Sequence, residues 1–267
     1  MQTLMHFVAI TGIMLLYYFL PVIFFYYILY VRNKAKWLPL KIQKKQPGNE
    51  QMRRELKLSL IALAIFSVAV FFMYEASMRG YTRVYFNINE YSWWYFGLSF
   101  FLNVFVNDSL FYWTHRFMHL RWVFPYIHLG HHRFKTPTPF GTLAFDPLES
   151  VLHSLTYILL IFIIPVHPII FFAFHAYNQL ANVAGHCGYE LMPEKMHRHW
   201  FFNWQNTITN HDTHHKKFNC NYGNYFLIWD ILMNTLDKKK TKLKKETITA
   251  ATIKIEETHL CTIKSFL

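Results

Sequence analysis

The apolar residues of this chain are gathered into five long runs, and this pattern limits the fold more than any other feature of the sequence. Hydrophobic residues make up 53% of the 267 residues and charged residues only 16%, whereas about a quarter of the residues in a soluble domain are charged. A membrane-spanning helix needs roughly 20 consecutive apolar residues. The runs cover residues 4–31, 56–76, 93–113, 148–164 and 168–184. We therefore predict an all-α, polytopic membrane protein with about four to five transmembrane helices.

The first and last runs carry further signals. Only Pro165-Val166-His167-Pro168 separates the fourth run from the fifth. Two prolines three residues apart break a helix, which predicts a tight helical hairpin. No Lys or Arg precedes Arg32, so the first run lacks the basic region of a secretory signal and is predicted to be a retained transmembrane segment.

The basic residues are distributed unequally between the hydrophilic stretches. Residues 32–57 include nine Lys or Arg, whereas residues 77–92 include two. Because cytoplasmic loops are enriched in Lys and Arg, the first stretch is predicted to be cytoplasmic. If each run crosses the membrane once, the stretches after the third and fifth runs also lie on the cytoplasmic side. We expect a helical cap there. The net charge of +12 then favours contact with lipid headgroups over binding of nucleic acid, since the basic residues flank apolar runs.

Eight of the sixteen histidines fall in three short boxes within this predicted cap. The boxes are His115-x-x-x-His119, His128-x-x-His131-His132 and His211-x-x-His214-His215. At this histidine content about 0.06 HxxHH boxes are expected by chance, and the chain has two. Residues three or four apart share a helix face, so each box offers at least two rings to one point. Whether the first histidine of an HxxHH box pairs with the fourth or the fifth residue stays open. Eight imidazoles exceed the roughly four to six positions of one transition metal, which predicts two metals.

Other polar residues near the boxes are candidates for the same site. His186 follows the fifth run at the same predicted depth and is a further candidate ligand. Asp108 lies seven residues before His115 within an apolar run, where a carboxylate is costly without a partner, so we expect it to bind a ligand imidazole. Asp212 adjoins His211 and is expected to orient a ligand ring. The isolated histidines are predicted to be packed or interfacial: His6, His153, His167, His175 and His259. Weaker candidates, or residues whose roles stay open, are Glu149, Glu190, His197 and His199.

Motifs around the boxes add a family resemblance. They include Asn107-Asp108 and Tyr112-Trp113 before His115, His186-Cys-Gly-Tyr-Glu190, and Asn221-Tyr222-Gly223-Asn224-Tyr225 followed by Trp229-Asp230. With the boxes, these motifs resemble the fatty acid hydroxylase and sterol desaturase superfamily. The chain departs from two branches of the superfamily. Sterol-oxidising members often read His-Pro-x-Glu where this chain has Asp146-Pro147-Leu148-Glu149. The fatty acid 2-hydroxylase branch has a second histidine shortly after the one that resembles His186, where this chain has Glu190.

The resemblance implies a non-haem di-iron oxygenase of lipid biosynthesis. Such an enzyme uses dioxygen and external electrons to hydroxylate or desaturate a C–H bond of a sterol, fatty acyl or related lipid from the bilayer. The eight boxed histidines and His186 would hold two iron ions. The chain would divide into N-terminal membrane segments with a basic loop (1–92), a catalytic region (93–236) and a basic tail (237–267). We expect an integral protein of the endoplasmic reticulum in a eukaryote, or of the inner membrane in a bacterium.

The electron donor would be a separate protein, because the sequence carries no His-Pro-Gly-Gly haem motif, no GxGxxG and no cysteine cluster. A cytochrome b5 or ferredoxin is implied. Lys216-Lys217 and Lys238-Lys239-Lys240 are candidates for attracting an acidic donor, or for contact with lipid headgroups. The sequence leaves the oligomeric state open.

Two other functions are compatible with many histidines in a membrane protein. A metal-dependent lipid hydrolase would use a metal-activated water, but the sequence shows no obvious metal-bridging carboxylate. A metal transporter would need ligands at several depths of the bilayer, whereas the boxes cluster at one predicted face.

Overall fold

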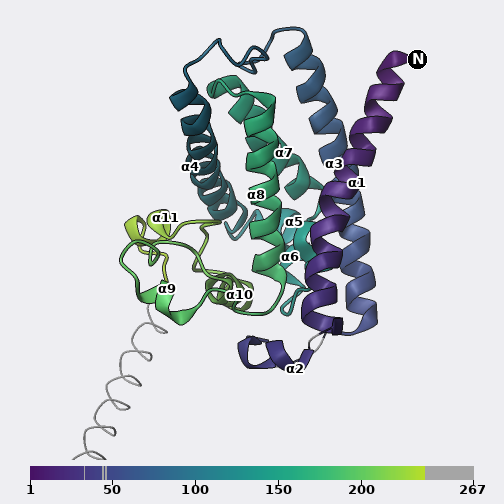
Figure 1. The fold of residues 1–267 in the computed structure, drawn as a ribbon. Coiled ribbons are helices and arrows are strands. Elements are labelled where there is room, and N and C mark those ends of the chain that lie inside the picture. The colour runs from purple at the N-terminus through teal and green to yellow at the C-terminus, as the bar shows by residue number, and fades with distance from the viewer. Residues whose placement is uncertain (33, 44, 46, 238–267) are drawn as a thin grey trace, which may run out of the picture.

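The computed structural model describes residues 1–237 except 33, 44 and 46. Over these residues the secondary structure is helical, and β-structure is limited to isolated bridges. The predicted all-α class is therefore confirmed. Long helices stand side by side as an upright bundle (Figure 1). They are α1 (Gln2–Tyr26), α3 (Asn49–Met78), α4 (Trp93–Met118), α7 (Pro147–Ile163) and α8 (Pro168–His186).

Each apolar run corresponds to one of these long helices. The predicted hairpin is present, since α7 ends at Ile163 and α8 begins at Pro168. The side chain of His167 caps α8 by accepting a hydrogen bond from the Ile169 amide at 3.2 Å. Helix α3 begins at Asn49, before its apolar run, because the mostly polar residues 49–55 extend the helix beyond its apolar part.

Short helices gather at one end of the bundle (Figure 1). They are the π-helical turn Tyr27–Arg32, α2 (Lys34–Trp37), the 3-10 turn Leu38–Leu40, α5 (Phe124–Ile127), α6 (Leu129–His132), the 3-10 turn Pro139–Leu143, α9 (Glu194–Arg198), α10 (Ile208–Lys217) and α11 (Ile228–Leu232). Part of the basic stretch packs against the segment after α8 at this end. The Ile42 amide donates to the Gly188 carbonyl at 3.0 Å, and the Glu190 amide donates to the Leu40 carbonyl at 2.8 Å.

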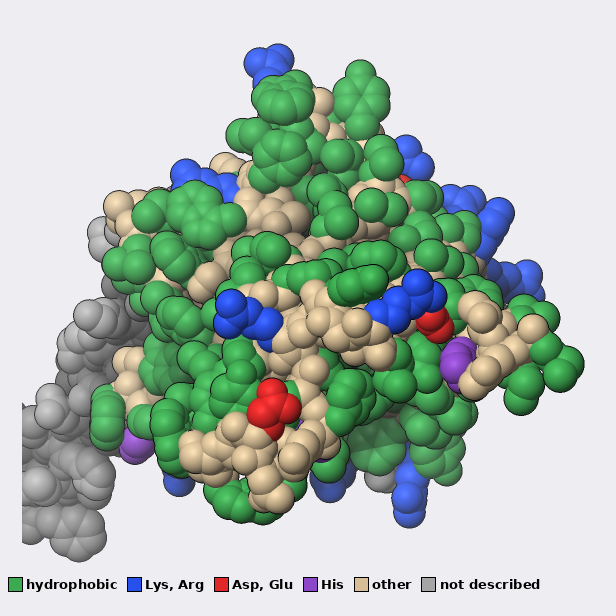
Figure 2. Space-filling model, turned by 90° about the horizontal axis from the view of Figure 1, so that it is seen from above, with side chains coloured by type: hydrophobic (Ala, Val, Ile, Leu, Met, Phe, Trp, Pro, Cys, Tyr) green, Lys and Arg blue, Asp and Glu red, His purple; other side chains and the backbone are tan. Residues whose placement is uncertain are grey.

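Two described helices are long and apolar enough to cross a membrane, α1 with its π-helical extension (Gln2–Arg32) and α3. Only 11% of the most apolar window of the first helix is buried inside the protein. Most of the apolar side chains of that helix therefore lie on the outer surface of the protein. Soluble proteins rarely expose a continuous apolar surface of this kind, whereas lipid tails would cover it. Figure 2, which views the bundle from above, shows hydrophobic side chains over most of the visible face, with charged side chains in scattered groups.

Two packed clusters hold the helices around the bundle interior. Tyr18, Ala62, Phe66 and Val183 belong to a cluster that joins α1, α3 and α8. A second cluster joins α4, α7 and α8 through Val104, Leu160 and Phe174, among others. These contacts bring the ends of α4 and α8, which carry histidines, to the same end of the molecule.

A buried carboxylate fixes the chain that follows the second histidine box. Glu55 in α3 is fully buried. It accepts hydrogen bonds from the Gln51 side chain at 2.7 Å, from the Thr138 amide at 3.4 Å and from the Thr138 hydroxyl. Because a buried carboxylate is stable only when its oxygens are bonded, these contacts attach the segment around Thr138 firmly to α3.

Candidate metal centre

The structure brings all nine predicted ligand histidines together in two groups. Within each group the candidate ligand nitrogens lie within 4.8 Å of one another. The first group is His115, His119, His128, His132 and His214, and the second is His131, His186, His211 and His215. Seven of the nine rings are buried, and His119 and His211 are partly exposed. The histidines come from the end of α4 and the residue after it, from α6 and the residue before it, from the end of α8 and from α10.

Each HxxHH box serves both groups. In the second box, His128 and His132 belong to the first group and His131 to the second. In the third box, His211 and His215 belong to the second group and His214 to the first. Adjacent residues on a helix point about 100° apart, so an HH pair cannot direct both rings to one point. The structure thus selects the i, i+4 pairing, which the sequence left open.

The close spacing of the ring nitrogens in the first group is typical of atoms that share a cation. His132 Nε2 lies 3.2 Å from His119 Nε2 and 3.1 Å from the Nε2 atoms of both His128 and His214. A neutral imidazole carries at most one proton on that nitrogen, so at most one of these contacts can be a hydrogen bond donated by His132. The same limit holds if His132 Nε2 carries a lone pair and accepts, so the remaining contacts bring like groups together, lone pair against lone pair or N–H against N–H, and a cation bound by the lone pairs removes this conflict.

Backbone carbonyls hold several of the histidine rings so that the Nε2 lone pair of each ring points into its histidine group. His115 Nδ1 donates to the Tyr222 carbonyl at 2.8 Å, and His214 Nδ1 donates to the Cys220 carbonyl at 2.7 Å. In the second group, His186 Nδ1 donates to the Asn182 carbonyl at 2.8 Å. With the proton on Nδ1, each Nε2 presents a lone pair. Two nitrogens bound at about 2.1 Å to one metal lie about 3.0 Å apart at a right angle, close to the spacing seen here.

The rings are held neutral by their surroundings. Burial lowers the pKa of His131, His211, His214 and His215 well below the ordinary value of 6.5, and the neighbouring imidazoles lower it further. Neutral imidazole is the form that binds a metal. Among the described residues no carboxylate belongs to either group. An all-imidazole donor set suits iron, zinc, copper or nickel.

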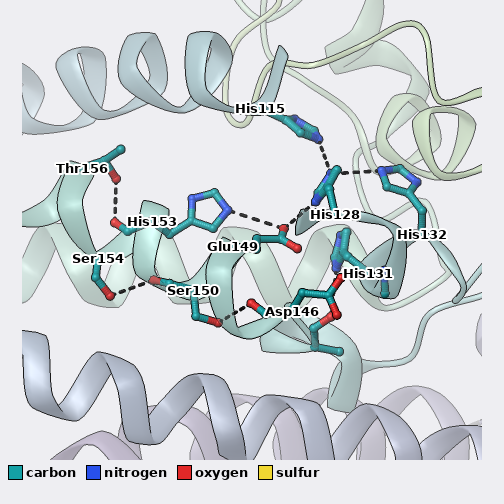
Figure 3. Close-up of polar contacts among 12 residues, drawn as sticks. His115, His128, His131, His132, Asp146, Glu149, Ser150, His153, Ser154 and Thr156 are labelled. Atoms are coloured by element: carbon teal, nitrogen blue, oxygen red, sulfur yellow. Dashed lines mark hydrogen bonds and ion pairs between the residues drawn. The ribbon is translucent and has the colours of Figure 1, made fainter. Parts of the chain in front are cut away.

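Carboxylates from the start of α7 support the second box (Figure 3). Glu149 is fully buried, and its Oε1 lies 2.7 Å from His128 Nδ1 and 3.7 Å from His153 Nε2. Asp146 accepts a hydrogen bond at 2.8 Å from the Gly130 amide, between His128 and His131. Asp146 and Glu149 therefore hold the box in place. Glu149 was only a weak candidate from sequence, because its partner lies 21 residues earlier in the chain.

The predicted contacts of Asp108 and Asp212 with ligand rings are wrong. Asp108 accepts hydrogen bonds from the amides of Tyr225 at 2.7 Å and Phe226 at 3.3 Å. Seven residues of helix span about 10 Å, too far for Asp108 to reach the ring of His115. Asp212 binds Lys216 and Gln43 instead of His211, because neighbouring side chains on α10 diverge.

The loop 220–226 was missed as part of the site by sequence reasoning. Its fold depends on Asp230, which accepts hydrogen bonds from the amides of Tyr222 at 2.9 Å and Gly223 at 2.8 Å. These bonds aim the carbonyls of Cys220 and Tyr222 at His214 and His115. The motif Tyr222-Gly223 followed by Trp229-Asp230 was the available signal, although only the folded loop shows its purpose. Asp108 anchors the same loop from α4.

Replacing Gly223 by Ala is expected to disturb this loop. A Cβ at position 223 would collide with the Phe226 carbonyl oxygen, and forced overpacking costs about 1–3 kcal/mol. We expect a lower midpoint of thermal unfolding and weaker metal retention in detergent-purified protein. Gly97→Ala in α4 is the matched control, because nothing lies within 4 Å of its Cβ position. Equal effects of the two substitutions would contradict the role of the loop.

The remaining candidate residues lie outside the two groups. Glu190 accepts hydrogen bonds from the amide and hydroxyl of Thr209, near the start of α10, and lies 3.9 Å from His197. The ring of His199 stacks on Trp200. Of the isolated histidines, His6 lies 3.8 Å from Glu75, and His259 falls outside the described residues.

An apolar cavity in the bundle borders both groups. Its walls include His115, His128, His131, His186 and His211 at one end, with His153 and Glu149 beside them. A second, almost wholly apolar cavity adjoins it. The two share the lining residues Ile13, Val70, Met73, Phe171 and Phe172. The second reaches Pro168 at the opposite end of α8, so together the cavities follow most of that helix.

Comparisons with known proteins agree with the site. A family model described as "Fatty acid hydroxylase" matches residues 100–235, which include all nine histidines. Human lathosterol oxidase is 32% identical over 182 residues, covering 67% of this chain and 59% of that protein. Delta(7)-sterol 5(6)-desaturase ERG3B of Gibberella zeae is 29% identical over 176 residues, covering 66% of this chain and 53% of that protein. The chain thus spans less than two thirds of these relatives. No solved structure matches it significantly.

Proposed function

This chain belongs to the fatty acid hydroxylase family, and on that premise we propose that it is a membrane oxidoreductase that hydroxylates or desaturates a C–H bond of a lipid. The main support for this proposal is that two all-imidazole groups lie beside an apolar cavity. Two iron ions held by these groups would supply the activation of dioxygen that attack on an unactivated C–H bond requires. The names of the relatives favour a sterol or a related lipid as the substrate.

The residues of the chain would position the reactants and exclude water. Glu149 and the carbonyls of Cys220, Tyr222 and Asn182 orient the ligand rings. The apolar walls of the cavity accept a lipid tail and keep bulk water from the histidine end, which protects an oxidising site from side reactions.

We place the histidine end at the cytoplasmic face of the membrane. The basic stretch after α1 packs at the same end of the bundle as the histidine groups, and basic loops favour the cytoplasm. In this arrangement α1, α3, α4, α7 and α8 would supply the four to five spans. The membrane would be the endoplasmic reticulum in a eukaryote or the inner membrane in a bacterium.

Electrons would come from an external donor such as a cytochrome b5 or ferredoxin. Of the basic residues predicted to attract it, Lys216 binds Asp212 and Lys217 binds Asp237. These pairings leave less positive charge for a partner at that site. Lys238-Lys239-Lys240 lies outside the described residues.

Metal analysis and lipid profiling test the proposed function. We expect detergent-purified protein to contain about two iron ions per chain, given its two histidine groups. Deleting the gene should remove one lipid product and cause its precursor to accumulate. The product should be 16 mass units heavier than the precursor after hydroxylation, or 2 units lighter after desaturation, and its formation should require dioxygen. Zinc with lipid-ester cleavage in the absence of dioxygen would instead indicate a hydrolase, and metal flux into proteoliposomes would indicate a transporter.

A further inference from the structure

Helix α8 carries a line of polar side chains through the bundle. His175, Asn178, Gln179, Asn182 and His186 recur at intervals of three and four residues, so they share one helix face. All but Gln179 line the cavity that borders the histidine groups. Polar side chains in such an apolar interior are costly without partners. Only His186 is explained by the proposed metal centre.

Asn178 holds a tyrosine hydroxyl at the cavity wall. Its amide nitrogen donates to the Tyr157 hydroxyl at 2.9 Å, and its amide oxygen accepts from the Tyr225 hydroxyl. Asn107 in turn donates to the Tyr225 hydroxyl at 3.3 Å. The Tyr157 oxygen is thus used as an acceptor. No acceptor for the hydroxyl proton of Tyr157 is found among the residues that the structure describes. The Tyr157 hydroxyl can therefore still donate one hydrogen bond.

His175 has an unused nitrogen on the same wall. Its Nε2 is buried and has no hydrogen-bond partner within the described part of the chain. The ring packs edge-on against Tyr157, with centroids 5.0 Å apart, and against Phe171 at 4.3 Å. Tyr17 on α1 donates to the His175 carbonyl at 3.1 Å and closes the wall from the other side. Buried polar atoms are nearly always bonded to protein, water or a ligand, so this nitrogen is free to accept a hydrogen bond from a ligand in the cavity.

We propose that the cavity binds a hydroxyl-bearing lipid whose hydroxyl group lies between the Tyr157 hydroxyl and His175 Nε2. A hydroxyl oxygen can accept the Tyr157 proton and donate its own to Nε2, which satisfies both groups at once. His175 precedes His186 by eleven residues, or about 16 Å along a helix axis. The hydroxyl is therefore held well away from the carbon that meets the histidine groups. This inference rests on the proposed lipid oxidation and narrows its substrate class.

Binding to the purified full-length chain in detergent tests this site without any turnover. The probes are two matched pairs, cholesterol with its 3-deoxy analogue 5-cholestene, and octadecanol with octadecane. We expect the wild-type chain to bind the hydroxylated member of at least one pair about tenfold more tightly, as two hydrogen bonds between neutral groups predict. His175→Phe and Tyr157→Phe should each remove most of that preference. Tyr177→Phe is the matched control, because Tyr177 on the same helix does not line this cavity.

The outcomes separate the lipid sources and the two proposals. A preference confined to the cholesterol pair indicates a sterol hydroxyl, and one confined to the octadecanol pair indicates a long-chain alcohol. No preference in either pair, or a preference that survives both substitutions, would overturn the proposed site. Tyr157→Phe removes a single oxygen atom and keeps the test valid if His175→Phe does not fold. Because binding needs neither iron nor dioxygen, failure of the proposed oxidation would leave these results unchanged.

Discussion

His214→Ala and His215→Ala are expected to remove different metals, although the two residues are neighbours in the chain. His214 belongs to the group of five histidines and His215 to the group of four. Each substitution should lower the iron content from about two ions per chain to about one and abolish lipid oxidation, because a metal site depends on its full ligand set. After His214→Ala the remaining iron should therefore be the ion of the group of four, and after His215→Ala the ion of the group of five.

Elemental analysis of detergent-purified variants measures the loss, and lipid profiling of cells that express them measures the activity. His197→Ala is the matched control, since His197 lies in α9 beside Glu190 and belongs to neither group. The double variant should retain almost no iron. If either single variant kept both metals, the assignment of that histidine would be wrong.

The long helices and the gathering of the histidines could be predicted from sequence because both follow from short-range patterns. Apolar runs mark the part of a helix that needs an apolar environment, so the bounds of α4, α7 and α8 were approximated well. The start of α3 was missed because residues such as Glu50 and Arg54 extend a helix without being apolar. The unequal distribution of Lys and Arg then predicted that the boxes would share one end of the bundle.

The division of the rings and the partners of the carboxylates could not be predicted in this way. Residues at i+3 and i+4 are equally close to residue i on a helix surface, so only the assembled helices show which ring joins which group. Asp108 binds amides 117 and 118 residues away, and Asp212 contacts Gln43 across 169 residues. Such partners depend on tertiary packing, which local spacing does not record.

Glu149→Leu is expected to weaken iron binding by about 10–100-fold, the usual effect of removing a group that orients a ligand imidazole. Glu149 is fully buried, and its Oε1 lies 2.7 Å from His128 Nδ1. Leucine would leave that nitrogen without a partner and the ring free to turn. Competition with a chelator, read as the concentration that removes half of the iron, measures the change. Glu50→Leu on the exposed end of α3 serves as the control.

Glu149→Gln separates orientation from charge. The amide oxygen of glutamine would occupy the position of Oε1 beside His128 Nδ1 and is able to accept its proton, but the negative charge is gone. If orientation dominates, Glu149→Gln should stay within about threefold of wild type while Glu149→Leu falls the full amount. If the two variants are equally weak, the buried charge itself stabilises the metals, which is reasonable where neither histidine group includes a carboxylate among the described residues. Wild-type chelator resistance in both would show that Glu149 has no part in holding the metal.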